Sequence, residues 1–442
     1  MDTNLQESSC EVLVIGVGPA GSTIAALLAQ RGHDVLMLEK SKHPRFHIGE
    51  SLLPMNMPMF DQLGVSEEIK RIGMVKLGAE FVSPWHDAPV MIDFNHALDN
   101  TWPSAYQVRR DEFDEILFKN AAAKGARVVE ECKVTDIKFQ PGVEAVVNTV
   151  GKDGHTQRIR AKFVVDASGR DTFLSNHFQM KHRNKKHNSA AIFGHFSGAT
   201  RLEGEVEGNI SLFWFDHGWF WFIPLDDGNT SIGATCWPYY MKTRKTDTSQ
   251  FLLDTIAMCP ALVERLKEAK LVSPVTATGN FSYLSERSSG ENYILLGDAF
   301  AFIDPVFSSG VFLAMASAFA GADAVERCLK KPQEAEQALK EFDKAIMQGP
   351  KVFSWFIYRI TTPAMRNLLM YKGTESKVKR ALITILIGDV YRTRRYAFWL
   401  FMFKTMYYGL TLTNLKASIM AWRKRKRSIR VHDVGVTETY GN

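Results

Sequence analysis

The sequence has few cysteines and none of the spacings that would make them act together. Its 442 residues include only 5 cysteines, which are scattered and form no C-x-x-C pair, and its 12 histidines form no H-E-x-x-H pair. A disulfide framework and a zinc site are therefore not expected, and no metal ligand is predicted. The cysteines are expected to be small buried residues in a reducing compartment, which favours the cytoplasm.

The sequence also lacks a clear export signal, a repeat and a long apolar run. The opening residues, MDTNLQESSC, contain no basic region followed by an apolar stretch. Residues 396–413 are 18 residues with a single charge, Lys404, whereas a transmembrane helix needs about 20 predominantly apolar residues. With 45% hydrophobic and 11% aromatic residues, the composition is globular and excludes a disordered or fibrous chain.

Acidic residues are scarce in only one part of the chain. Residues 1–350 contain 36 Lys and Arg against 44 Asp and Glu, whereas residues 351–442 contain 18 against 4. The net charge of +6 therefore combines a body of −8 with a tail of +14. No recognised nucleic-acid-binding motif accompanies the basic residues, so nucleic acid is not an expected partner.

The first forty residues carry the spacing of a dinucleotide-binding fold. An apolar run at residues 12–15 is followed by Gly16, Gly18 and Gly21, then by a helical pattern and a second apolar run that ends at Glu39. Gly16 permits a tight strand-to-helix turn, Gly18 lets the backbone approach a pyrophosphate, and Gly21 lets the helix lie close to the sheet. Glu39 is placed to accept hydrogen bonds from an adenosine ribose.

Two later segments favour an extended FAD over a nicotinamide cofactor. Residues 162–172 predict a strand ending at Asp166, and residues 293–296 predict a strand followed by Asp298 and, later, a helix that begins near Ser309. Asp298 can accept from a ribityl hydroxyl, and the second helix N-terminus offers backbone N–H donors to a negative group. The alternative that Asp166 and Asp298 only cap their loops is left open at this point.

Five segments together resemble the flavin-dependent halogenases, a branch of the aromatic-hydroxylase-like FAD monooxygenases. They are GVGPAGS, PRFHIGESLLP, MVKLGAEF, GWFWFIPL and GDAFAFIDPVFSSGV, and the resemblance covers about residues 10–345. The most specific parts are Lys76 in an apolar, glycine-rich setting and the W-x-W-x-I-P string that contains Trp219 and Trp221. The likeness is greatest to members that act on phenolic or carrier-tethered aromatic substrates.

The resemblance implies a chemistry in which FADH2, O2 and a halide (chloride or bromide) produce hypohalous acid. Lys76 is expected to hold or capture that oxidant, as an ammonium donor or as a free amine whose pKa desolvation lowers. Trp219 and Trp221, on one face of a strand, are expected to separate the flavin from the substrate. The resemblance further implies cofactor contacts from Arg45, Glu50, Arg110 and Pro305, and halide contacts from the backbone amides of Ser309 and Gly310. His47 is expected to pack in its loop rather than act as a base, and Arg109 to lie at the surface.

The expected architecture is α/β, with an FAD-binding Rossmann-like (ββα) domain interleaved with a mixed β-sheet substrate domain. The FAD-binding domain is assigned to residues 8–79, 103–175 and 288–345, the substrate domain to 80–102 and 176–287, and a helical basic region to 346–430. No second glycine fingerprint for a nicotinamide is found, so a separate NAD(P)H flavin reductase is expected as a partner. Residues 181–188 are expected to form a solvated basic loop.

Alternatives remain for the activity and for the basic tail. The chain could instead be an FAD-dependent aromatic hydroxylase, or a non-catalytic flavoprotein that scaffolds a complex at a membrane. Residues 396–430 fit a cap helix over the active site, a peripheral contact with the inner face of the membrane, or docking of an acidic acyl carrier protein. The predicted reaction belongs to secondary-metabolite or pigment biosynthesis.

Overall fold

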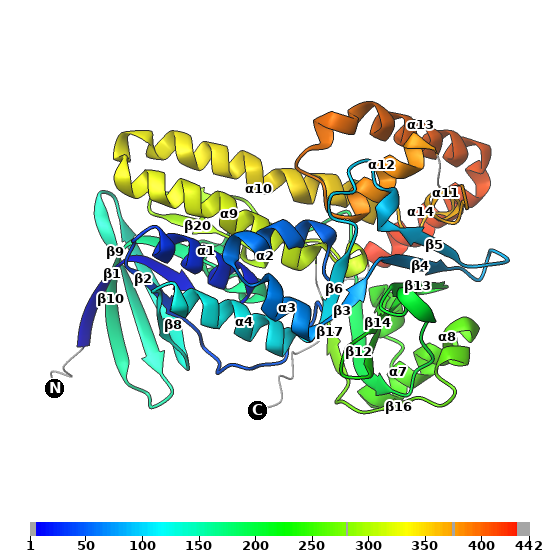
Figure 1. Ribbon diagram of the computed structural model, residues 1–442, viewed down its shortest axis with the longest axis horizontal. Helices are drawn as coiled ribbons and strands as arrows, with labels where there is room; N and C mark the ends of the chain where they lie inside the picture. The colour runs from blue at the N-terminus through cyan, green and yellow to red at the C-terminus, as the bar shows by residue number, and fades with distance from the viewer. Residues whose placement is uncertain (1–5, 280–281, 374–375, 431–442) are drawn as a thin grey trace.

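The structure is a computed structural model that describes residues 6–279, 282–373 and 376–430. Figure 1 shows two sheets side by side along the long axis, with the C-terminal helices over the second one. The predicted α/β architecture, a Rossmann-like sheet interleaved with a mixed sheet and followed by a helical region, is confirmed. The limits of the functional domains stay a prediction.

The first sheet has a parallel core in the order β20–β10–β1–β2–β7. Strand β9 pairs with β10 on one side and with β8 on the other, so the β8–β9 hairpin extends the sheet. Val12, Leu13 and Val14 of β1 are fully buried, as expected for a parallel strand that is covered on both faces. The strands are β1 (Gln6–Ile15), β2 (Val35–Leu38), β7 (Arg127–Val129), β8 (Cys132–Gln140), β9 (Val143–Gly151), β10 (Thr156–Asp166), β19 (Ser289–Gly290) and β20 (Tyr293–Leu295).

The second sheet is mostly antiparallel, in the order β16–β12–β15–β14–β13–β4–β5, with β17 also paired to β12. Its strands are β4 (Gly78–Val82), β5 (Val90–Asp93), β12 (Ala190–Ser197), β13 (Ile210–Phe215), β14 (Gly218–Pro224), β15 (Asn229–Cys236), β16 (Lys270–Leu271) and β17 (Thr276–Thr278). Two small sheets complete the fold. They are β3 (Gly73–Lys76) with β6 (Ala105–Val108), and β11 (Lys181–Arg183), β18 (Tyr283–Ser285) and β21 (Ala301–Phe302).

Helices cover the sheets and form the C-terminal region. In the first part of the chain they are α1 (Pro19–Gln30), α2 (Met57–Leu63), α3 (Ser66–Ile72), α4 (Arg110–Ala123) and α5 (Phe173–His177). Beside the second sheet lie α6 (Pro238–Met241), α7 (Thr248–Ala257) and α8 (Pro260–Arg265). The remaining helices are α9 (Ser309–Lys330), α10 (Ala335–Ile357), α11 (Pro363–Leu369), α12 (Lys377–Leu386), α13 (Ala397–Thr413) and α14 (Leu415–Arg430). Across the described parts of the chain, no helix is both long and apolar enough for a membrane span.

The aromatic residues of β14 divide between two cores because successive side chains of a strand point to opposite faces. Trp219 and Trp221 pack toward the C-terminal helices, while Phe220 and Phe222 pack toward α7 and α8. All four side chains are buried. The second sheet is therefore the wall between the two cores, and its tryptophan face belongs to the core that the C-terminal helices complete.

Candidate active site

The turn between β1 and α1 forms an open cradle in front of Gly18. Gly16 has φ +91°, and a Cβ on Gly21 would lie 1.9 Å from the carbonyl oxygen of Gly16, so both positions require glycine. A Cβ on Gly18, in contrast, would meet only Arg45 Nη2, at 3.9 Å. The space beside Gly18, at the N-terminus of α1, thus suits a phosphate group.

Glu39 and Arg45 border this cradle. Glu39, buried at the end of β2, accepts hydrogen bonds from the backbone N–H of Val17 (3.1 Å to Oε2) and of Ser41 (3.0 Å to Oε1). Arg45 Nη2 lies 3.7 Å from Glu39 Oε2, while its Nε is buried and has no hydrogen-bond partner in the structure. A buried guanidinium donor without a partner beside a helix N-terminus fits a diphosphate, so these residues fit the adenosine half of FAD.

Arg110 is held rigidly at the start of α4. Its Nε and Nη2 donate to the two carboxylate oxygens of Asp114 at 2.8 and 3.0 Å, and its Nη1 donates to the carbonyl oxygen of Ile48 at 2.7 Å. Burial raises the pKa of the Asp298 carboxyl to about 6, opposed by the nearby Arg170 and Arg110 guanidinium groups. Asp298 therefore lies in the electrostatic field of Arg110, as a shared ribityl site would require.

His47, in the adjoining loop, is neutral at physiological pH. Burial, together with the neighbouring Arg110 charge, lowers the pKa of the imidazole to about 4. Its Nδ1 lies 2.8 Å from the carbonyl oxygen of Ile48, to which it can donate. These contacts hold His47 within its own loop.

The contacts of Asp166 are those of a loop cap. One carboxylate oxygen accepts from the backbone N–H of Ser168 at 2.9 Å and the other from that of Leu174 at 2.7 Å. The loop-capping alternative thus describes its contacts in the structure, while a cofactor contact by Asp166 stays a prediction.

The predicted halide residues lie at the start of α9. The short helix Pro305–Phe307 leads to Ser308, which has φ +53°, and α9 begins at Ser309. A Cβ on Gly310 would have as its nearest neighbour a ring carbon of Phe302, at 3.8 Å, so this backbone can be approached closely. First-turn amides at such a helix start can bind an anion, although a halide contact at Ser309 and Gly310 stays a prediction.

The loop before α9 is fixed by a buried acid. Asp304 Oδ2 accepts from the hydroxyl of Ser189 at 2.8 Å and lies 2.7 Å from His187 Nε2. All three residues are buried. The basic side chains of residues 181–188 are exposed, as expected, but the segment is not all loop, because Lys181–Arg183 form a short strand, and His187 is buried against Asp304.

Lys76, at the end of β3, is almost completely buried. Its Nζ donates to Ser51 Oγ at 2.8 Å and to the carbonyl oxygen of Leu52 at 3.0 Å, and it lies 5.4 Å from the centre of the Phe94 ring. Among the described residues no carboxylate pairs with it. Burial lowers the pKa of the Lys76 ammonium to about 7.

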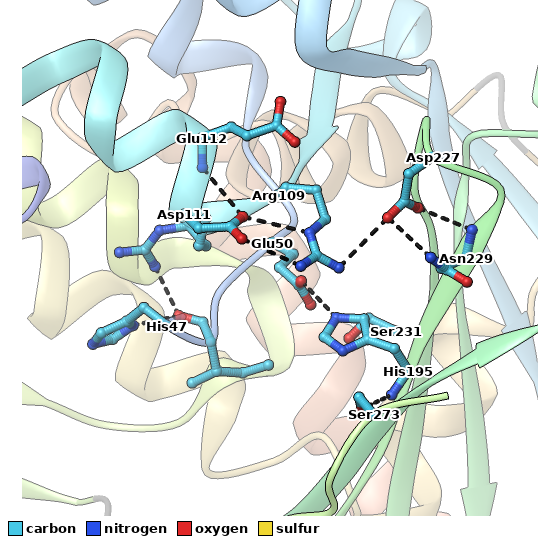
Figure 2. A network of polar contacts seen from close by, with 12 residues as sticks. His47, Glu50, Arg109, Asp111, Glu112, His195, Asp227, Asn229, Ser231 and Ser273 are labelled. Atoms are coloured by element: carbon cyan, nitrogen blue, oxygen red, sulfur yellow. Dashed lines mark hydrogen bonds and ion pairs between the residues drawn. The ribbon is translucent and has the colours of Figure 1, made fainter. Parts of the chain in front are cut away.

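Glu50 and His195 form a buried pair at the residue that precedes the Lys76 partners Ser51 and Leu52. Figure 2 shows the His195 ring turned toward Glu50, and His195 Nε2 lies 2.8 Å from Glu50 Oε1. Glu50 immediately precedes Ser51 and Leu52, so the pair fixes the segment that holds Lys76. The second oxygen, Glu50 Oε2, is buried without a partner in the described part of the chain. Only one carboxylate oxygen of Glu50 is thus paired, with His195. A flavin contact by Glu50 stays a prediction.

Arg109 lies at the surface, as expected, but its side chain is partly covered and forms ion pairs. Arg109 Nη2 lies 3.3 Å from Asp111 Oδ2, and Arg109 Nη1 lies 3.5 Å from Asp227 Oδ2 (Figure 2). These ion pairs join the start of α4 to the turn between β14 and β15. The side chain is only partly exposed because it connects α4 to a turn of the second sheet.

The two predicted tryptophans are in contact. The ring centres of Trp219 and Trp221 are 6.0 Å apart, and Trp221 Nε1 donates to Ser231 Oγ at 3.3 Å. Phe193 of β12 packs against Trp221 at 5.8 Å. Ser231 and Phe193 therefore hold the orientation of the Trp221 indole.

Sequence reasoning missed Ser51, Leu52, Phe94 and His195. Ser51 and Leu52 lie in the PRFHIGESLLP segment beside Glu50, and this adjacency was the one available signal. His195 stands alone in an apolar strand and Phe94 follows β5, so neither carries a local pattern.

The fold and the cradle first define an FAD-binding protein. Residues 9–337 match the family model described as FAD binding domain. A flavoprotein/dehydrogenase from Cytophaga hutchinsonii superposes with a TM-score of 0.84 at 30% identity, covering 92% of this chain and 100% of that one. FAD is accordingly the cofactor.

More particular relatives follow. A flavin-dependent halogenase of Penicillium aethiopicum is 34% identical over 378 residues, covering 78% of this chain and 69% of the relative. The structure of the myxobacterial chondrochloren halogenase superposes with a TM-score of 0.76 at 31% identity, covering 87% of this chain and 93% of that one. The chain belongs to the flavin-dependent halogenases, enzymes that use FAD, O2 and a halide.

Proposed function

We propose that this enzyme halogenates an electron-rich, phenolic ring, and that Lys76 delivers the oxidised halogen. The observation that carries the proposal is a buried lysine held by a hydroxyl and a carbonyl, with no carboxylate partner in the described structure. An ammonium has three N–H donors, of which Ser51 and Leu52 occupy two. The third position remains for the oxidant, as an N–H donor or, in the free amine, as the lone pair.

Reduced FAD and O2, when bound, supply the oxidising equivalent that converts halide to hypohalous acid. The residues of this chain hold the reactants. Gly18 and Arg45 receive the diphosphate, Asp298 receives a hydroxyl, and the first turn of α9 receives the halide. Hypohalous acid held at Lys76 Nζ then forms a carbon–halogen bond with the ring as its oxygen–halogen bond breaks, and the leaving hydroxide takes the ring proton to give water. The carbon acquires the halogen without any further oxidant.

The tryptophan face of β14 supports separation of the two reactions. Trp219 and Trp221 are large, buried and held by neighbours, so they can keep an aromatic substrate from the flavin. A substrate kept apart in this way is not hydroxylated directly. A substitution separates this role from simple packing. Exchange of either indole for a smaller ring should raise the yield of hydroxylated by-product or the rate of uncoupled flavin oxidation.

The substrate and partners follow from the same chemistry. A relative from Pseudomonas fluorescens, 28% identical over 417 residues, is a 1H-pyrrole-2-carbonyl-[peptidyl-carrier protein] chlorinase. This supports a carrier-tethered aryl substrate in secondary-metabolite or pigment biosynthesis. A separate NAD(P)H flavin reductase supplies the reduced flavin, which fits a cytoplasmic location.

Activity with purified components tests the proposal. Protein, FAD, a flavin reductase, NADH, O2 and bromide should halogenate monochlorodimedone or a hydroxybenzoyl thioester, read as product mass with and without bromide. Lys76→Ala should retain flavin binding and oxidation of reduced flavin but lose organic halogenation. Halogenation at the wild-type rate by this variant would refute the lysine assignment. A hydroxylated product formed without halide would favour a hydroxylase, and absence of any substrate-dependent turnover would favour a scaffold.

A further inference from the structure

Helix α13 has apolar side chains on two opposite faces, but only one face is packed. Its inner face contributes Leu400, Phe403 and Tyr407 to the core over the second sheet. The opposite face, here called the outer face, consists of Phe398, Phe401 and Leu412, which are 62%, 64% and 70% exposed, while Tyr408 at its border is tied to Arg359 and Trp355. A helix that is apolar all round is normally buried all round. The outer face is thus a large exposed apolar surface of the kind that marks an interaction site.

Cations bracket the outer face in the chain. Between residues 390 and 432 there are 11 Lys and Arg and no Asp or Glu. Arg394 and Arg395 are exposed just before α13, and Lys416 and Lys426 are exposed in α14 after it. Leu415 and Trp422 of α14 add further exposed apolar side chains. Large apolar and aromatic residues flanked by cations are typical of helices that lie at a lipid–water interface.

We propose that the outer face of α13 docks the protein on the surface of a bilayer containing anionic phospholipid. The packed inner face keeps α13 attached to the protein, so the helix would lie in the plane of the interface. Pairing with a second copy through this face would bring two cationic segments together and repel. An acidic carrier protein would satisfy the cations but would leave the apolar face in water. Only an anionic lipid surface matches both features.

Vesicle co-sedimentation of the full-length protein tests this proposal independently of halogenation. The probes are vesicles of phosphatidylcholine alone and of phosphatidylcholine mixed with phosphatidylglycerol. We expect binding to the mixed vesicles, weakened by high salt, and little binding to phosphatidylcholine alone. The triple variant Phe398→Gln/Phe401→Gln/Leu412→Gln should lose about tenfold or more in vesicle affinity. It should keep the thermal unfolding profile and the activity of the wild type on a free phenol.

A control variant removes the same number of exposed apolar residues elsewhere on the protein. Leu253→Gln/Met258→Gln/Val263→Gln changes side chains on and beside α7 and α8 that are 41%, 44% and 39% exposed, and it should leave vesicle binding unchanged. Equal vesicle binding by the wild type and the outer-face variant would overturn the proposal. So would a wild-type dimer in light scattering that the outer-face variant abolishes, or displacement of the protein from vesicles by an acidic carrier protein that needs the same residues.

Discussion

Two buried lysines in different regions of this molecule show what separates a structural cation from a reactive one. Lys76 lies at the end of β3, beside the second sheet, and Lys379 lies in α12 of the C-terminal region. Both are almost fully buried, and neither pairs with a carboxylate of the described residues. Burial lowers the pKa of the ammonium to about 7 at Lys76 and to about 8 at Lys379.

The difference lies in the number of acceptors. Lys379 Nζ donates to the carbonyl oxygens of Leu368, Leu369 and Tyr371 at 3.2, 2.9 and 3.1 Å, which close the C-terminus of α11. All three of its N–H donors are used, as in a helix-capping cation. Lys76 has only two acceptors and therefore keeps one position free. Burial and a lowered pKa do not by themselves make a lysine functional. Lys76 is distinguished by the N–H donor that its two acceptors leave unused.

Paired substitutions give the largest expected contrast between the two lysines. Lys76→Met should lower the halogenation rate at least about a hundredfold, because a positioned proton donor or nucleophile is lost. Lys379→Met should retain activity per folded molecule within about twofold but lower the free energy of unfolding by about 1–3 kcal/mol, since it leaves buried carbonyl groups unsatisfied. Product formation and urea unfolding measure the two effects. If the variants exchanged these effects, the distinction drawn from acceptor number would be wrong.

Loss of the Glu50–His195 pair should have a smaller effect than loss of Lys76 itself, and one that can be measured separately. His195→Gln should lower kcat by about tenfold with little change in KM, because the segment holding Lys76 loses its buried partner at Glu50. His195 is a positioning residue here, so its loss should also shift the midpoint of the pH–rate profile that Lys76 sets. Kinetics across pH measure both.

His217→Gln serves as the control for that substitution. His217 lies in the turn between β13 and β14, where its ring stacks on Tyr240. Its exchange should leave the midpoint and kcat unchanged. A uniform loss of activity in both histidine variants, with no shift of the midpoint, would reduce His195 to a packing role.

The sequence predicted the parts of the fold and site whose cause is local. Gly16 and Gly21 were identified because a tight turn and a close helix–strand approach allow no side chain, and the structure shows both constraints. The split of β14 into an indole face and a phenyl face follows from strand alternation alone. Lys76 was singled out because its apolar, glycine-rich setting resembles that of the halogenases, and its placement in the reaction rests on the same resemblance.

The remainder depends on contacts between distant residues. Glu50 and His195 are 145 positions apart, and no local pattern relates them. His187 contacts Asp304 across 117 positions, so this one residue of an otherwise exposed basic segment is buried. The apolar, weakly charged stretch of α13 was visible in the sequence, but which of its faces is packed depends on the helices around it.

The smallest expected difference between Lys76 and Lys379 lies in how the free energy of unfolding depends on pH. A lysine whose pKa is lower in the folded protein than its ordinary value of about 10.5 binds fewer protons there than in the unfolded chain, so stability rises with pH above the folded pKa. Each lysine can contribute at most about 1.4 kcal/mol per pH unit in this window. Lys76 should contribute from about pH 7 and Lys379 only from about pH 8. Between pH 7 and 8 the unfolding free energy of Lys76→Met should therefore rise less steeply than that of the wild type, while Lys379→Met should follow the wild type until pH 8. Urea unfolding at closely spaced pH values measures these slopes, and parallel curves for all three proteins would show that neither lysine titrates in this range.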